Sequence, residues 1–221
     1  MKLVKKAGEN VKQWYQSKIF PILMDKNLGR KEIIQERIDI LSYAKGDILE
    51  LGIGTGNNLP LYPDTVKKLT AIDSYVREIE SSRIEVALYP YACEDMKFED
   101  NSFDVVVCTF CLCSVSDVGK TLQEVKRVLK DGGLFLVLEH GKARNRILQF
   151  LQQIANPFFQ SLACGCNVNR DYFEQMKEQG FIMQEKCIRK CKIQPSLVAG
   201  HLYRAVATVR KEQNEHGKNN L

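Results

Sequence analysis

Three glycines at every second position give the sequence its clearest candidate for a ligand-binding loop. The stretch ILELGIGTGNN spans residues 48–58, and its apolar start contains Glu50. The glycines are Gly52, Gly54 and Gly56. Glycine has no Cβ and reaches backbone angles that other residues avoid, so a ligand can lie against bare peptide. An ordinary turn after a strand needs one glycine, and we therefore expect these three to contact a ligand.

The spacing of this loop favours a nucleoside with a positive charge over a dinucleotide. A dinucleotide fingerprint would place its third glycine at position 57, which is Asn57. Glu50 would repel phosphates but attract a cation, and the proline-interrupted stretch after the loop offers a pyrophosphate only a short helix N-terminus. Asp73 ends a second apolar run and can accept hydrogen bonds from both hydroxyls of a ribose. An acid at that position could also cap the next helix.

A histidine and a glutamate follow a later apolar run and could take part in proton transfer. Glu139 and His140 stand directly after residues 134–138. Histidine has a pKa suited to a general base at neutral pH. Both residues could instead be structural, with the histidine bonded to the backbone and the glutamate to a loop amide.

Five of the eight cysteines gather at two places in the sequence. They are Cys108, Cys111, Cys113, Cys164 and Cys166. Zinc sites usually contain paired C-x-x-C elements, and only one such element is present, on a strand that we expect to be buried. We interpret these cysteines as small buried apolar residues and expect no metal. Binding of a soft ligand, redox sensitivity and structural zinc are the alternatives.

Composition narrows the class of protein further. The chain has 221 residues, of which 44% are hydrophobic and 27% charged, as in a soluble globular protein. A net charge of +5 without dense basic clusters argues against a nucleic-acid partner. We see no signal peptide or transmembrane segment, and so many cysteines without an export signal indicate reduced thiols in the cytoplasm. Peripheral membrane contact, and the choice between monomer and homodimer, stay open.

Short apolar runs alternate with helical stretches from residue 46 onward. The expected strands are residues 48–51, 69–72, 89–92, 105–108 and 134–138, and the expected helices are near residues 76–84, 118–129 and 144–159. This alternation predicts an α/β fold with a mostly parallel sheet and helices on both faces. A helix near residues 170–179 and strands at 181–192 and 202–210 would add an antiparallel pair, which makes seven strands.

The two ends of the chain differ from this central region. Residues 1–45 are predicted to form a helical lid or extension, whose apolar stripe in the sequence after Gly29 ends near Gly46. Residues 46–210 would form the main domain, and residues 211–221 read as a disordered tail.

The motifs together resemble those of a known enzyme family. ILELGIGTG with Asp73 is similar to the cofactor site of class I S-adenosylmethionine-dependent methyltransferases, which have a Rossmann-like fold. CEDMKFEDNSFDVVVC and LQEVKRVLKDGGLFLVLEH resemble their ubiquinone-methyltransferase-like (type 11) branch. Within that branch VVVCTFCLCSV, LVLEH and CGCNVNRDYFEQMKEQGF are similar to the methyltransferase-like thiol methyltransferases.

The resemblance implies a role for each residue at a matching position. Glu50 and the three glycines would hold the methionine half of S-adenosylmethionine, and Asp73 would hold its ribose. Cys93 and Glu94 would lie along the adenine, and Thr109 would face the sulfonium. His140 and Glu139 are the catalytic candidates, and Cys113, Asn167 and Arg170 are the substrate candidates. Lys97 stands where the branch prefers proline, so the adenine loop is expected to differ.

The predicted activity is methyl transfer by in-line displacement to a small-molecule acceptor, with S-adenosyl-L-homocysteine as the second product. A thiol is the narrower expectation for the acceptor. An amine or a phospholipid headgroup is the alternative within the same chemistry. A regulator that binds S-adenosylmethionine without catalysis is the alternative from another class.

Overall fold

The computed structural model describes residues 28–74, 83–190 and 199–209 continuously, together with residues 15, 19, 26, 79, 81, 193 and 195. Its centre is a seven-stranded sheet with the strand order β3-β2-β1-β4-β5-β7-β6. The strands are β1 (Ile48–Leu51), β2 (Lys68–Ile72), β3 (Glu85–Tyr89), β4 (Phe103–Thr109), β5 (Leu129–His140), β6 (Ile182–Lys190) and β7 (His201–Thr208). The prediction of seven strands is confirmed.

The sheet combines a parallel part with an antiparallel end, as the sequence predicted. Strands β1 to β5 pair in parallel, and β7 lies antiparallel to both β5 and β6. The chain runs outward from β1 through β2 to β3, and then crosses back to β4 on the other side of β1. The reversal lies between β1 and β4, and ligands of open α/β sheets bind in the crevice beyond the carboxyl ends of the strands at such a point.

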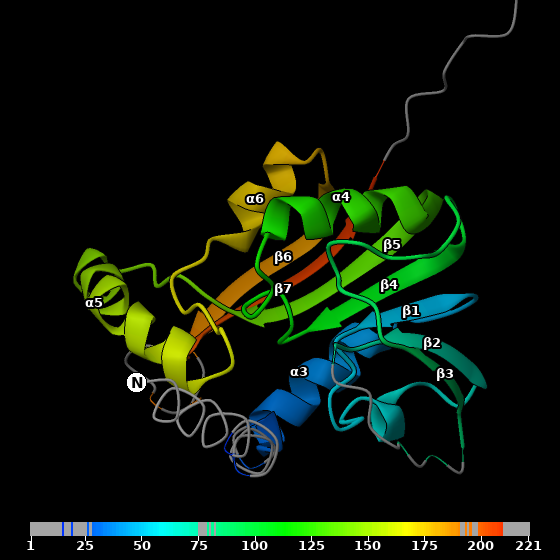
Figure 1. Ribbon diagram of the computed structural model, residues 1–221, viewed down its shortest axis with the longest axis horizontal. Helices are drawn as coiled ribbons and strands as arrows, with labels where there is room; N and C mark the ends of the chain where they lie inside the picture. Colours follow the sequence, from blue (N-terminus) through cyan, green and yellow to red (C-terminus); the bar gives the residue numbers. More distant parts are fainter. Residues whose placement is uncertain are drawn as a thin grey trace, which may run out of the picture.

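Helices cover both faces of the sheet (Figure 1). Helix α3 (Lys31–Leu41) lies on one face, and α4 (Val118–Val128) and α6 (Tyr172–Glu178) lie on the other. Helix α4 buries residues at helical spacing, including Val118, Leu122 and Val125, while Asp117 caps its first turn by accepting from the Lys120 amide. Each face has its own apolar core, so the central strands β1 and β4 are buried on both sides, while the edge strands β3 and β6 stay partly exposed.

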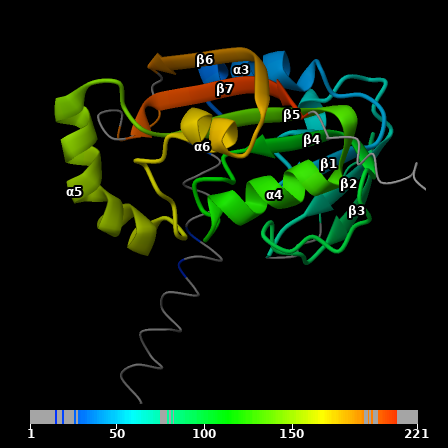
Figure 2. The ribbon, with the colours of Figure 1, turned by 90° about the horizontal axis from the view of Figure 1, so that it is seen from above.

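Helix α5 (Arg146–Leu162) lies beyond one end of the sheet (Figures 1 and 2). The Asn145 side chain caps it by accepting from two amides of its first turn. Its buried residues are polar: Gln152 bonds the amide of Ala143 and the carbonyls of Gly141 and Val168. These bonds attach α5 to the segment that follows β5.

Three predicted boundaries are wrong. Strand β3 occupies residues 85–89, where 89–92 was expected, and Tyr89 and Tyr91 of the expected run pack in an aromatic cluster with Phe98. Strand β5 begins at Leu129, five residues early, and α3 ends at Leu41 instead of near Gly46. Most of the expected helix at 76–84, most of the N-terminal extension before residue 28 and the tail from 211 lie outside the described residues. Residues 83 and 84, at the end of that expected helix, are not helical. Among the helices described, none has the length and apolar character needed to cross a membrane.

Candidate functional site

The glycine loop begins where β1 ends, on the crevice side of the sheet. All three glycines have positive φ, which other residues rarely adopt. A Cβ on Gly52 would lie 2.5 Å from the Cys111 Sγ, and one on Gly56 would lie 2.9 Å from Leu59. A Cβ on Gly54 would meet only a carbonyl oxygen at 4.0 Å. Two glycines therefore allow close packing within the protein, and Gly54 leaves main chain bare toward open space.

Asp73 holds this bare peptide in place. Its Oδ2 accepts a hydrogen bond of 2.9 Å from the Gly54 amide. The amides of Gly52 and Ile53 both donate to the carbonyl of Ile72, the residue before Asp73. The end of β2 therefore fixes the loop after β1, and the Asp73 carboxylate lies directly beside the open face of the loop.

Glu50 lies beneath the loop in a buried polar cluster. Its two carboxylate oxygens accept from the Asn58 side-chain amide at 2.9 Å and from the Tyr62 hydroxyl at 2.8 Å. Burial raises the pKa of the Glu50 carboxyl to about 7, although Tyr62, the Arg37 charge and Asn58 all lower it. Both oxygens already accept hydrogen bonds within the protein, so any contact of Glu50 with a ligand would use their remaining lone pairs.

Thr109 joins this cluster from the end of β4. Its hydroxyl accepts from the Arg37 guanidinium at 2.9 Å and from the Asn58 amide at 3.0 Å. Arg37 also donates to the Asn58 side-chain oxygen, and its guanidinium carbon lies 5.1 Å from the centre of the Phe110 ring. A buried cation thus connects α3 to the loop after β1 and to the turn after β4.

The two residues expected along the adenine lie in the loop before β4. The Cys93 Sγ is 3.7 Å from the Cys111 Sγ, next to the space that Gly52 leaves. The Glu94 Oε1 accepts from the amide and hydroxyl of Ser116 and from the Asp117 amide. Glu94 therefore organises the start of α4, on the same side of the crevice as Cys93.

Glu139 is fully buried at the end of β5 and supports the turn that follows β4. One oxygen, Oε1, accepts from the amides of Cys111 and Leu112 at 2.5 and 2.6 Å. The other oxygen has no hydrogen-bond partner among the described residues. Burial raises the pKa of this carboxyl well above its usual range. These contacts favour the structural alternative, a loop-amide acceptor, over a catalytic acid or base.

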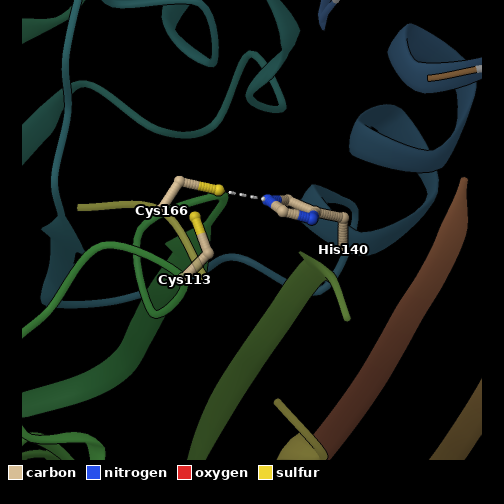
Figure 3. A group of neighbouring side chains, drawn as sticks. All are labelled: Cys113, His140 and Cys166. Atoms are coloured by element: carbon tan, nitrogen blue, oxygen red, sulfur yellow. Dashed lines mark hydrogen bonds between the residues drawn. The ribbon is translucent and has the colours of Figure 1, made fainter. Parts of the chain in front are cut away.

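His140 points toward two cysteines (Figure 3). Its Nε2 lies 3.1 Å from the Cys166 Sγ, and the Cys113 Sγ belongs to the same group. The three potential ligand atoms all lie within 4.8 Å of one another, and all three residues are buried. Within the described part of the chain Nδ1 has no hydrogen-bond partner, so the ring lacks the orienting group that a general base usually has.

The substrate candidates Asn167 and Arg170 donate hydrogen bonds to backbone carbonyls of the turn after β4. The backbone amide and the side-chain amide of Asn167 both donate to the Cys113 carbonyl, at 2.7 and 3.1 Å. Arg170 donates to the carbonyls of Leu112 and Val115. Asp171, the residue after Arg170, caps α6 by accepting from the Glu174 amide.

Three residues of the polar cluster were missed in the sequence. Arg37 falls on the apolar stripe of α3 with Ile33 and Ile40. A charged residue on such a stripe indicates a buried polar contact, so the sequence pattern could have identified it. Asn58 and Tyr62 reach Glu50 only because the loop turns back under β1, and no spacing rule indicates that contact.

Known proteins resemble the chain in sequence and in fold. Residues 49–137 match a family model described as a methyltransferase domain. Thiol S-methyltransferase TMT1B of Rattus norvegicus is 35% identical over 184 residues, which cover 73% of this chain and 75% of that protein. Thiol S-methyltransferase TMT1A of Homo sapiens is 33% identical over 175 residues, covering 72% of this chain and 70% of that protein.

A solved structure shows that the likeness extends to the fold over most of the chain. A protein from Methanosarcina mazei described as a SAM-dependent methyltransferase superposes with a TM-score of 0.60. It is 18% identical, and the match covers 79% of this chain and 98% of that chain. At this identity the likeness concerns the fold alone.

Proposed function

The chain belongs to the class I S-adenosylmethionine-dependent methyltransferases, and we propose that it transfers the methyl group of S-adenosylmethionine to a small-molecule thiol. The acceptor is the part that goes beyond the family. It is supported by the two thiol S-methyltransferases that match about seven tenths of the chain.

One observation carries the assignment of the cofactor site: the open face of Gly54 beside the Asp73 carboxylate. The methionine half of the cofactor would lie along Gly52, Gly54 and Gly56, with its ammonium toward Glu50. Asp73 would accept hydrogen bonds from the ribose hydroxyls, which are stronger when the acceptor is ionised. The adenine would lie along Cys93 and Glu94, and the sulfonium would face Thr109.

Methyl transfer from a sulfonium requires mainly that the enzyme align the two reactants. A nucleophile must lie in line with the methyl carbon and the sulfonium sulfur, which leaves as a neutral thioether. Holding two reactants in this geometry can lower a barrier by about 7–11 kcal/mol. A thiol with a pKa near about 8.5 is mostly protonated at neutral pH, so the enzyme also gains from whatever stabilises the thiolate.

Calorimetry with S-adenosylhomocysteine and a methyl-transfer screen of small thiols, amines and lipid extracts test the proposal. We expect S-adenosylhomocysteine to bind and thiols to be methylated. Asp73→Ala should weaken binding by about 10- to 100-fold, the value of one or two hydrogen bonds to a charged group. Asp64→Ala, which removes an exposed carboxylate paired with Arg83, is the matched control and should bind normally.

Each part of the proposal can fail separately. Unchanged affinity in Asp73→Ala would refute the ribose role. Methylation of amines or lipids without thiols would replace the acceptor, and binding without any methyl transfer would indicate a regulator.

A further inference from the structure

Three soft metal ligands from three separate segments converge beside the candidate site. Cys113 lies in the turn after β4, His140 is the last residue of β5, and Cys166 lies in the turn after α5. Figure 3 shows the three side chains directed toward a common point. Their exposed fractions are 4%, 7% and 8%, so all three are buried but each keeps a small exposed part.

The donor set and spacing suit a zinc ion. Zinc binds thiolate and imidazole at about 2.3 and 2.1 Å, so two sulfurs on one tetrahedral ion lie about 3.8 Å apart. The three donor atoms here lie within 4.8 Å of one another, and the Cys166 Sγ is 3.1 Å from the His140 Nε2. These separations are within about 1 Å of those that a tetrahedral zinc ion requires. Three protein ligands leave the fourth position open, as in catalytic zinc sites.

Two non-glycine residues beside the cysteines have a left-handed backbone conformation. Phe110 and Cys164 have φ of 56° and 50°, a left-handed conformation that costs a non-glycine residue about 1–2 kcal/mol. Such strain clusters at functional sites. Asn167, next to Cys166, joins the two cysteine turns by donating twice to the Cys113 carbonyl. The fold therefore holds the two thiols together through their backbones.

The trio also borders the proposed path of the methyl group. The His140 ring is stacked with that of Phe110, with centroids 6.4 Å apart, and Phe110 follows Thr109. Cys111, two residues before Cys113, fills the space that Gly52 leaves in the glycine loop. A ligand held by the trio would therefore be near Phe110 and Cys111, which adjoin Thr109 and the glycine loop.

We propose that Cys113, His140 and Cys166 bind a zinc ion whose fourth position takes the acceptor thiol as its thiolate. The proposal rests on the proposed thiol methylation. A thiol that coordinates zinc is deprotonated, and its proton passes to solvent. The thiolate then forms the new sulfur–carbon bond with the methyl group. The sulfonium bond to that methyl breaks, and its electron pair stays on the sulfur of S-adenosylhomocysteine. The products are a thioether, S-adenosylhomocysteine and one proton.

Titration of the chelator-treated, reduced protein with Zn²⁺, and with Co²⁺ as a coloured probe, tests the site directly. We expect one equivalent to bind, with a sulfur-to-cobalt absorption band. Cys166→Ser and His140→Ala should each lose at least 100-fold in affinity. Cys187→Ser is the matched control, because this thiol lies on β6 beside Arg189, and it should bind normally. Cooperative thermal unfolding of each variant verifies that it is folded.

Several outcomes would overturn the zinc site. These are the absence of stoichiometric binding, equal affinity in Cys166→Ser, and a Cys113–Cys166 disulfide that persists under reductant.

Adding a small thiol to the cobalt protein separates this proposal from the proposed function. We expect the cobalt spectrum to shift, and thiol methylation to fall at least 10-fold in Cys166→Ser while S-adenosylhomocysteine still binds. Full methylation by the zinc-free protein would overturn the role of the metal and leave the thiol methyltransferase assignment standing. A spectral shift without any thiol methylation would support the site and refute the proposed acceptor.

Discussion

At the level of single residues, Gly54 is the position where the proposed cofactor should depend most on a missing side chain. Its φ is +57° and a Cβ there would point into open space, so Gly54→Ala combines backbone strain with obstruction of the ligand. Gly132 has a φ of +71° and also has nothing within 4 Å of its Cβ position, but it lies inside β5. We expect Gly54→Ala to weaken S-adenosylhomocysteine binding at least 10-fold in calorimetry.

The control Gly132→Ala should carry the same backbone strain and bind the ligand normally. Both variants should lose about 1 kcal/mol of unfolding free energy, since an L-residue is strained in this conformation. Equal ligand affinity in the two variants would contradict the assigned role of Gly54.

Glu50 makes stability depend on pH in an unusual direction. Burial raises the pKa of its carboxyl from 4.5 to about 7 in the folded protein. Between these values the folded state holds a proton that the unfolded state has released, so the unfolding free energy falls as pH rises. Its contribution is complete below about pH 4.5 and is lost progressively up to about pH 7.

Glu50→Gln keeps the shape and removes this titration. The wild type should lose unfolding free energy from pH 5 to pH 8 through this group, and the variant should not. The difference between the two proteins should therefore shift by about 2 kcal/mol in favour of the variant over that range. Urea unfolding at the two pH values measures the difference. A constant gap between the two proteins would show that Glu50 titrates normally in the fold.

At the level of elements, the end of β5 supports the turn after β4 through a single side chain. Glu139 accepts from two amides of that turn with one oxygen, and a glutamine can do the same with its carbonyl. We expect Glu139→Gln to keep most of the methyl-transfer rate and the stability. Glu139→Leu should leave two buried amides unpaired and lose about 2–5 kcal/mol of unfolding free energy. A large loss of kcat in a stable Glu139→Gln would restore the catalytic interpretation.

The sequence predicted the buried elements better than the edge of the sheet. Almost every residue of β1 and β4 is buried, so a mainly apolar run in the sequence marks each strand. Strand β3 pairs only with β2 and alternates exposed with half-buried positions, so the neighbouring tyrosines gave a stronger but misleading signal. Helix α4 was found within one residue because its apolar spacing and its Asp117 cap agree.

At the level of the whole molecule, the site divides into a local part and a long-range part. The glycine loop and Asp73 are linked by consecutive strands, so the fold class alone predicts that they meet. Arg37 precedes the glycine loop in the sequence and Cys166 follows it by more than a hundred residues. Both reach the site through packing that no local pattern encodes. The sequence indicated two cysteine groups, but not that one member of each would face His140.

Ligand-linked stability of the intact protein gives the broadest test of the cofactor assignment. A ligand that binds only the folded state at 100 times its Kd adds about 2.7 kcal/mol. For a chain of this size that corresponds to a rise in Tm of about 5–10 °C. S-adenosylhomocysteine should produce this rise, and NAD at the same concentration should not, because Asn57 replaces the third glycine of a dinucleotide loop. Asp73→Ala should show a smaller rise at that S-adenosylhomocysteine concentration, since its Kd is higher. A rise with NAD alone would mean that the crevice accepts a pyrophosphate, and the cation-binding role of the loop would then be wrong.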